Sequence, residues 1–372
     1  MVMSSHYNDI LYANEATMSF SIADTIRKSL HKKIHASELG YPNTDVLLRQ
    51  LRKTLAIRMQ ENFNWVIEPH RIELLGDVLQ GIYLALQIFS SEGDAVITPD
   101  PVYHHFLKAT LHSRRKPVIN RLALTSIGYQ LDTEELEHMI KTNPTTRLLL
   151  LCNPHNPTGR VFSRTELHAI AEIAARYNII IVADEIHADI VYPSHTHTPI
   201  ASLSPEIAKN VITLTSASKA FNIAGLRCAV AIFGSEKLQQ QFLNYPEHLR
   251  ITASSLGIEA TLAAWRDGET WLKKTLTTLE FNRRFLKNYI EQKKLPDIRC
   301  HIPEATFFAW LDCRNLLQPN QPPDELFLCK AGIALTNGAI FGQGGEGFLR
   351  LNFAKSPEYL EKILERMRTG LF

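Results

Sequence analysis

Residues 216–227 read Ser-Ala-Ser-Lys-Ala-Phe-Asn-Ile-Ala-Gly-Leu-Arg, directly after an apolar, β-branched run. The run predicts a buried strand that ends in a turn. A lysine in this setting suits an amine that forms a Schiff base beside a phosphate, because the hydroxyls of Ser216 and Ser218 and the guanidinium of Arg227 are suitable ligands for a phosphate dianion. Most lysines, however, are solvated surface residues. The interpretation of Lys219 therefore depends on what else the chain supplies.

The composition is that of an ordinary globular enzyme. The 372 residues are 45% hydrophobic and 21% charged, with a formal net charge of +2, which gives no reason to expect nucleic-acid binding. The five cysteines form no Cys-x-x-Cys pair, so reduced thiols are expected rather than a disulfide framework. The start of the chain lacks a signal-peptide pattern, and no apolar run approaches the ~20 residues of a membrane helix. We expect a soluble, cytoplasmic protein without membrane partners.

Strand-like and helix-like segments alternate through the middle of the chain, which is typical of a mostly parallel α/β sheet. In the expected strands, residues that point to either face are apolar, as in sheets covered by helices on both faces. They lie at 95–98, 147–152, 179–183, 211–215 and 229–233. A capping box at 163–166 predicts a helix through about residue 177.

The last third of the chain has a different pattern. A long helical stretch begins near residue 255, and strands are expected at 307–310 and 347–351. We therefore predict an α/β fold in which residues 42–255 form a large domain. Residues 256–372 form a smaller αβ domain, which the N-terminal arm of residues 1–41 joins.

Polar side chains follow three of the expected strands. Asn156, Asp184 and Lys219 come at strand ends, where ligands collect in parallel α/β sheets. A carboxylate such as Asp184 keeps a pyridine nitrogen protonated, and the protonated ring withdraws electrons from a carbanion. Asn156 has the chemistry to bind the ring's phenolic oxygen, and Tyr103 to cover the ring face. Each also has a plain alternative, as a helix cap, a turn residue or a core residue, and only their combination points to a pyridoxal site.

The chain resembles the fold-type I pyridoxal 5′-phosphate (PLP) enzymes of the class I/II aminotransferase superfamily, and among them the MalY/PatB-type cystathionine β-lyases, or C–S lyases. The resemblance runs from about Met18 to the C-terminus. Its most specific segments are the Lys219 segment, Leu-Cys-Asn-Pro-His-Asn-Pro-Thr-Gly-Arg at 151–160, Ala-Asp-Glu-Ile-His-Ala-Asp at 183–189 and Gly-Phe-Leu-Arg-Leu-Asn-Phe-Ala at 347–354. The Asp-Glu-Ile-His and Ser-Lys-x-Phe-Asn forms favour the lyase branch.

The resemblance implies roles for individual residues. Lys219 would form the Schiff base with PLP, Asp184 would pair with the pyridinium, and Arg350 would bind the substrate carboxylate bidentately. Tyr41 would reach the phosphate of a neighbouring subunit, which places the active site at a homodimer interface. The other implied contacts are Tyr103 on the ring face, Asn156 and His187 near the phenolic oxygen, with Asn156 also near the substrate, and Ser216, Ser218, Arg227, Gly76, Asp77 and Val78 around the phosphate.

Two segments depart from the family pattern. An acidic Asp-Met-Asp-Phe-like segment is usual near the start, whereas this chain has Thr17-Met18-Ser19-Phe20. In the turn before the helix expected at the phosphate, Asp77 stands where small or apolar residues are usual. Backbone N–H groups at a helix start still bind a phosphate, but a carboxylate that points inward opposes the dianion. We therefore predict that the Asp77 side chain points away from the phosphate.

The expected reaction is β-elimination of a thiol from cystathionine or a related cysteine S-conjugate, which yields pyruvate and ammonia. Lys219 is the expected base that removes the Cα proton. An aminotransferase uses the same residues up to the carbanion and stays an alternative. A PLP-fold protein that acts mainly as a regulator through protein contacts is a third hypothesis.

Three histidines offer an alternative to this interpretation, a zinc site. His187, His195 and His197 include a His-x-His pair, but alternating histidines before Pro199 fit a loop better than a zinc site. No metal is expected.

Overall fold

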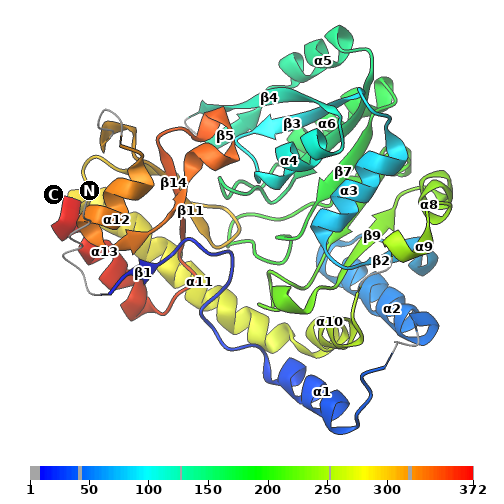
Figure 1. Ribbon diagram of the computed structural model, residues 1–372, viewed down its shortest axis with the longest axis horizontal. Coiled ribbons are helices and arrows are strands. Elements are labelled where there is room, and N and C mark those ends of the chain that lie inside the picture. Colours follow the sequence, from blue (N-terminus) through cyan, green and yellow to red (C-terminus); the bar gives the residue numbers. More distant parts are fainter. Residues whose placement is uncertain (1–8, 41–43, 126–127, 251–252, 317–320, 372) are drawn as a thin grey trace.

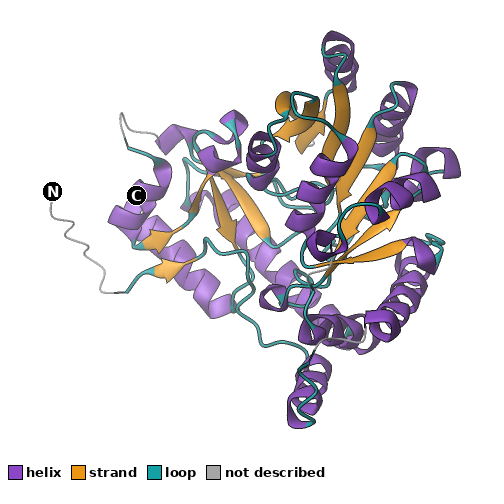
Figure 2. Cartoon of the chain, turned by 45° about the vertical axis from the view of Figure 1, so that its right-hand side comes forward, coloured by secondary structure: helices purple, strands orange, loops and turns teal. Residues whose placement is uncertain are grey.

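The chain folds into a large and a small α/β part that lie side by side (Figure 1). The computed structural model describes residues 9–40, 44–125, 128–250, 253–316 and 321–371. Each part has its own sheet, with helices packed around it (Figure 2). The predicted α/β class, with a mostly parallel central sheet and a smaller αβ region, is confirmed.

Eight strands form the sheet of the large part. They are β2 (Ile72–Leu75), β3 (Ala95–Asp100), β4 (Lys116–Thr125), β5 (Gly128–Leu131), β6 (Thr146–Cys152), β7 (Ile180–Asp184), β8 (Val211–Thr215) and β9 (Ala229–Phe233). Their order is β2-β9-β8-β7-β6-β3-β4-β5. The five strands from β8 to β4 run parallel, whereas β9, β2 and β5 join antiparallel at the edges. The five strands predicted for this region lie within two residues of the observed ones.

Alternate residues of the central strands enter two hydrophobic clusters, one on each face of the sheet. In β6, Leu149 and Leu151 belong to one cluster, and Leu148 and Leu150 to the other. Helices α3 (Val78–Phe89), α4 (His105–His112) and α8 (Glu236–Leu243) supply residues to the second cluster, and α5 (Thr133–Thr142) and α6 (Arg164–Arg176) to the first. Burial on both faces explains why these strands are continuous apolar runs.

Two local features place the helices beside the sheet. Helix α6 begins at the predicted capping box, in which the Ser163 hydroxyl and the Glu166 side chain each accept the other residue's N–H. Helix α3 lies directly on the sheet at Gly81, where an added Cβ would stand 2.8 Å from Leu214 and 2.8 Å from Leu75. This close approach brings the N-terminus of α3 to the carboxyl ends of the parallel strands.

The small part is built on a four-stranded antiparallel sheet of order β10-β11-β14-β13. Its strands are β10 (Arg299–Cys300), β11 (Phe308–Asp312), β13 (Thr336–Asn337) and β14 (Phe348–Asn352). Strand β1 (Leu11–Tyr12) pairs with β12 (Ile333–Ala334), which brings the start of the N-terminal arm beside this part. That the whole arm belongs to a small domain stays a prediction. The helices here are α11 (Glu269–Tyr289), α12 (Pro323–Ala331) and α13 (Pro357–Leu371).

The predicted long helical stretch is two helices, α10 (Ser255–Asp267) and α11, which meet at Gly268. Helix α10 packs against α1 (Asp24–His35) and α2 (Thr44–Phe63), whereas α11 packs against α13 of the small part. The domain boundary at residue 255 stays a prediction. The two remaining short helices are α7 (Pro205–Ala208) and α9 (Glu247–Arg250). Among the described residues, no helix is both long and apolar enough to cross a membrane.

Candidate active site

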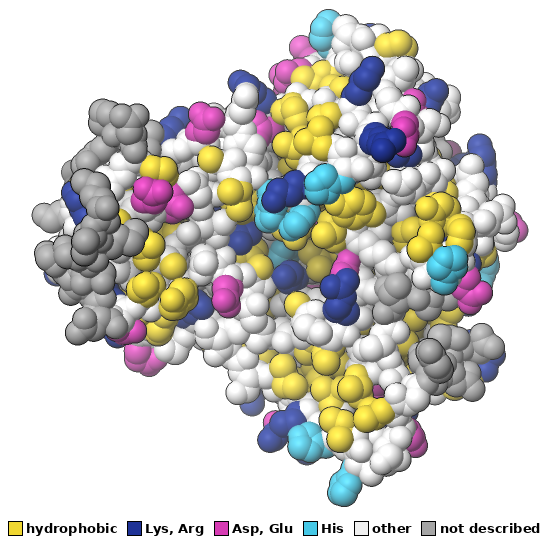
Figure 3. Space-filling model, in the orientation of Figure 1, with side chains coloured by type: hydrophobic (Ala, Val, Ile, Leu, Met, Phe, Trp, Pro, Cys, Tyr) yellow, Lys and Arg dark blue, Asp and Glu magenta, His cyan; other side chains and the backbone are white. Residues whose placement is uncertain are grey.

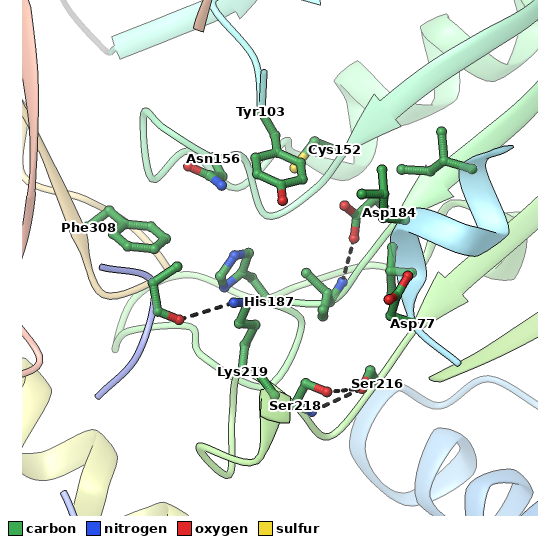
Figure 4. A pocket seen from close by; sticks show the side chains of 16 residues that line it. Asp77, Tyr103, Cys152, Asn156, Asp184, His187, Ser216, Ser218, Lys219 and Phe308 are labelled. Carbon is green, nitrogen blue, oxygen red and sulfur yellow. Dashed lines mark hydrogen bonds between the residues drawn. The ribbon is translucent and has the colours of Figure 1, made fainter. Parts of the chain in front are cut away.

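A cavity of about 220 Å³ lies where β6, β7 and β8 end (Figure 4). Asn156, Asp184 and Lys219 all line it, because the carboxyl ends of adjacent parallel strands meet at one edge of the sheet. Figure 3 shows that the molecule is hollowed near the centre of one face, where Lys, Arg and His side chains gather. Basic side chains at such a hollow favour an anionic ligand.

Lys219 lies in the turn after β8, and its Nζ donates to the Ala16 carbonyl oxygen at 3.1 Å. Burial, assisted by the nearby positive charge of Arg350, lowers the Lys219 pKa to about 8. A lowered pKa leaves a larger share of the amine neutral near pH 7, and the neutral amine is the form that attacks a carbonyl or accepts a proton.

Asp184 is the last residue of β7, and its carboxylate accepts the Ile186 N–H at 3.1 Å. Burial raises the Asp184 pKa to about 7, although that hydrogen bond and the charge of Lys219 oppose the shift. A buried carboxylate of this kind is stabilised by a cationic N–H partner. The structure thus places at the end of β7 a carboxyl group suited to a protonated ring nitrogen.

Arg350 lies in the middle of β14 and contacts Asn156, which lines the cavity. Its Nη1 donates to the Asn156 Oδ1 at 3.0 Å and its Nη2 to the Asn14 carbonyl oxygen at 3.3 Å. The guanidinium carbon lies 4.0 Å from the centre of the Phe308 ring. The contact with Arg350 holds the amide oxygen of Asn156 and turns its nitrogen toward the cavity (Figure 4). Burial lowers the Arg350 pKa to about 10.

His187 and Tyr103 face the same cavity. Burial lowers the His187 pKa to about 3, with help from the charges of Lys219 and Arg350, so the ring is neutral at physiological pH. The ring of Tyr103 projects into the cavity from the side opposite Lys219 (Figure 4), and burial raises its pKa to about 12. Tyr103 therefore presents a flat, uncharged ring to the cavity.

The predicted phosphate contacts gather around the N-terminus of α3. Asp77 and Val78 line the cavity there, and so do Ser216 and Ser218, whose hydroxyl oxygens are 2.7 Å apart. The Asp77 carboxylate accepts the Gln80 N–H at 2.7 Å as the N-cap of α3, and it also forms an ion pair with Arg227. Sequence reasoning did not anticipate this pairing between two predicted phosphate neighbours. The prediction that Asp77 points away from a bound phosphate stays a prediction.

The structure does not support the predicted roles of two further site residues, Gly76 and Tyr41. The Gly76 N–H donates to the Gln80 side-chain oxygen at 2.7 Å, so its predicted phosphate contact gains no support from the structure. Tyr41 lies outside the described residues.

Sequence reasoning also missed some of the cavity wall. Cys152 is in register with Asp184 on the neighbouring strand, and its place at the end of a predicted strand was a usable signal. Ala16 and Phe308 line the cavity from the N-terminal arm and from β11. No local sequence pattern marks these two, because they are brought there by the packing of the small part on the large one.

The three histidines considered for zinc have separate surroundings. His197 Nε2 lies 3.0 Å from the buried Glu185 carboxylate, and His195 lies 4.0 Å from Glu304. His187 belongs to the cavity described above. In the part of the chain that the structure describes, no three His, Cys, Asp or Glu side chains group in a way that could hold a metal ion.

Comparison with known proteins identifies the family. The family described as aminotransferase class I and II matches residues 7–367. The chain belongs to this family. A putative cystathionine beta-lyase of Mycobacterium leprae is 33% identical to it over 389 residues, which cover 100% of this chain and 94% of that protein. Cystathionine beta-lyase PatB of Bacillus subtilis is 30% identical, over 96% of this chain and 91% of that protein.

Solved structures agree with this membership of the class I and II aminotransferase family. Cystalysin from Treponema denticola, whose crystal structure contains a PLP cofactor, matches with a TM-score of 0.93 and 29% identity. The match covers 98% of this chain and 92% of that one. The resemblance to PLP enzymes of the MalY/PatB type, which the sequence motifs indicated, is thereby confirmed.

Proposed function

We propose that the chain is a PLP-dependent carbon–sulfur β-lyase. It would cleave cystathionine or a related cysteine S-conjugate to a thiol, pyruvate and ammonia. The observation that carries the proposal is the meeting of Lys219, Asp184 and Asn156 in one cavity at three adjacent strand ends. The names of the relatives support the lyase reaction over other uses of the same residues.

The residues present fit PLP. Asp184 is a buried carboxyl group whose raised pKa calls for a cationic N–H partner, which a pyridinium provides. The His187 Nδ1 is buried without a hydrogen-bond partner among the described residues, so it is available to a polar ligand atom. Two serine hydroxyls and the start of α3 suit a phosphate. When bound, PLP withdraws electrons from the Cα of an attached amino acid.

Lys219, Arg350 and Tyr103 have separate roles in the proposed reaction. Lys219, with a pKa lowered to about 8, takes the Cα proton as general base. Arg350 binds the substrate carboxylate. Its Nε is buried without a hydrogen-bond partner among the described residues, which leaves a donor for one carboxylate oxygen. Tyr103 keeps water from one face of the site. Expulsion of the thiolate from Cβ then needs only a substrate that carries sulfur there.

Purified protein incubated with cystathionine tests the proposal. Prompt release of pyruvate and a thiol without an added keto acid supports the lyase, and Lys219→Ala should abolish it. A strict requirement for a keto acid acceptor, with amino-group transfer to it, would instead identify an aminotransferase. A panel of cysteine S-conjugates assayed for pyruvate would name the preferred substrate.

We further propose a cytoplasmic homodimer whose two sites are shared between subunits through Tyr41. The free state of all five cysteines supports a reducing compartment. Sedimentation of the full-length protein tests the assembly: a dimer is expected, and a monomer at micromolar concentration with full activity would exclude the shared site.

A further inference from the structure

Residues 13–21, called the strap below, run between β1 and α1 along the side of the molecule where the two parts meet (Figure 1). The strap begins beside β12 of the small part, where the Ala13 N–H donates to the Ala334 carbonyl oxygen. It contains the Thr17–Phe20 segment that departs from the family pattern. Its hydrogen bonds to Lys219 and Arg350 are made by main-chain carbonyl oxygens.

Two asparagine side chains hold the strap. Asn352 Nδ2 donates to the carbonyl oxygens of Glu15 at 2.6 Å and Thr17 at 2.7 Å. Asn222 Nδ2 donates to the carbonyl oxygens of Met18 at 3.0 Å and Phe20 at 2.9 Å. Each amide therefore bridges two carbonyls that are two residues apart.

Two other carbonyls of the strap bind cations instead. Ala16 lies between the two residues held by Asn352, and its carbonyl oxygen accepts from Lys219 Nζ at 3.1 Å. Asn14, two residues earlier, accepts from Arg350 Nη2 at 3.3 Å. Asn352 thus holds the residues on both sides of Ala16, whose carbonyl binds one of the two cations that line or adjoin the cavity.

Both asparagines are also close to those cations in sequence. Asn352 follows Arg350 by two residues at the end of β14, and Asn222 follows Lys219 by three. Their amide oxygens are held in turn, by the N–H of Ala354 at 2.8 Å and the N–H of Met18 at 3.0 Å. Each side-chain amide is therefore fixed from both ends.

We propose that Asn222 and Asn352 are positioning residues that hold the strap in the register in which the Ala16 carbonyl orients the Lys219 amine. This inference rests on the proposed role of Lys219 as base. A buried amine needs an acceptor, and a main-chain carbonyl supplies one without forming an ion pair that would hold the proton. Because main-chain atoms make these contacts, they are compatible with the altered side chains at 17–20.

The test uses isosteric variants of the full-length protein. Asn352→Asp and Asn222→Asp keep the acceptor oxygen but replace the donating nitrogen by a second acceptor, and Asn352→Ala repeats the loss without adding a charge. Asn282→Asp is the matched control, because its amide bridges the carbonyls of Phe353 and Lys355 at 2.9 and 2.8 Å, outside the strap.

Loss of two hydrogen bonds should make the amide of Met18 exchange about tenfold faster with solvent than in the control. In the chain freed of cofactor, Lys219 should be modified about tenfold faster by an amine reagent, and in the holoenzyme kcat should fall about tenfold with a smaller change in KM. One outcome would overturn the proposal. In it, the strap amide exchanges faster in the Asn352 and Asn222 variants, but the rate of Lys219 modification and kcat equal those of Asn282→Asp. Exchange and modification need no turnover, so they remain informative if the lyase reaction itself is not found.

Discussion

The carboxylate of Asp77 and the guanidinium of Arg227 form an ion pair at the N-terminus of α3. Strands β3 to β8 lie between the two residues in the sequence. Both residues were predicted to lie near a phosphate. Arg227 adopts a left-handed backbone with φ of 49° after the short turn Ala224–Leu226, which carries its side chain toward α3. The pair places a negative charge beside the residues that would bind a dianion.

Asp77→Asn should therefore bind PLP more tightly. Asparagine caps a helix as well as aspartate does, so the variant removes the charge and keeps the contact with the Gln80 N–H. The pair is partly exposed, so a change of about two- to fivefold in Kd is expected, from roughly 0.5–1 kcal/mol. Absorbance titration of the cofactor-free chain measures it. Asp312→Asn, which breaks the Asp312–Arg314 pair of the small part, is the control, and weaker binding by Asp77→Asn would contradict the prediction.

The pH dependence of Lys219 reactivity follows from its environment. Burial and the charge of Arg350 lower its pKa from 10.5 to about 8, and an amine reacts only when it is neutral. Modification of Lys219 in the cofactor-free chain should rise with pH and level off above a midpoint near 8. Arg350→Gln should move this midpoint upward because it removes one cause of the shift. Peptide mass spectrometry across the pH range follows the reaction, and a midpoint near that of free lysine would refute the assignment.

Arg350→Lys should raise KM for the amino-acid substrate about tenfold or more, since lysine keeps the charge but loses the fork that binds a carboxylate through two hydrogen bonds. It also loses the contact with Asn156. Steady-state pyruvate formation gives KM, and the Kd for PLP should change much less. Arg314→Lys serves as the control, because Arg314 pairs with Asp312 in the small part. An equal rise in KM for this variant would mean a general loss of structure.

Gly81→Ala should destabilise the protein by about 1–3 kcal/mol, as overpacked cores do. Its Cβ would lie 2.8 Å from side-chain carbons of Leu214 and Leu75, beneath α3. Denaturant unfolding with and without PLP measures the loss, and cofactor affinity should fall with it because α3 is displaced. Gly40→Ala, where nothing lies within 4 Å of the added Cβ, should have little effect.

Local patterns were enough to predict the strands that carry the site. Asn156, Asp184 and Lys219 follow apolar runs whose length and continuity identify buried parallel strands, and the carboxyl ends of such strands share one edge. Motif likeness then indicated the family, because residues such as those at 151–160 and 216–227 are close together in sequence. The outline of the fold, the family and the three strand-end groups were accessible without coordinates for this reason.

Contacts between distant segments were decided only by the tertiary structure. The pairing of Asp77 with Arg227, the contact of Arg350 with Asn156 and the two asparagines that hold the strap each join segments far apart in sequence. The acceptor for Lys219 is a main-chain carbonyl of Ala16, a group that every residue carries and that no sequence motif can distinguish. Which carbonyl faces the lysine depends on how the small part packs on the large one, and that packing is a property of the whole folded chain.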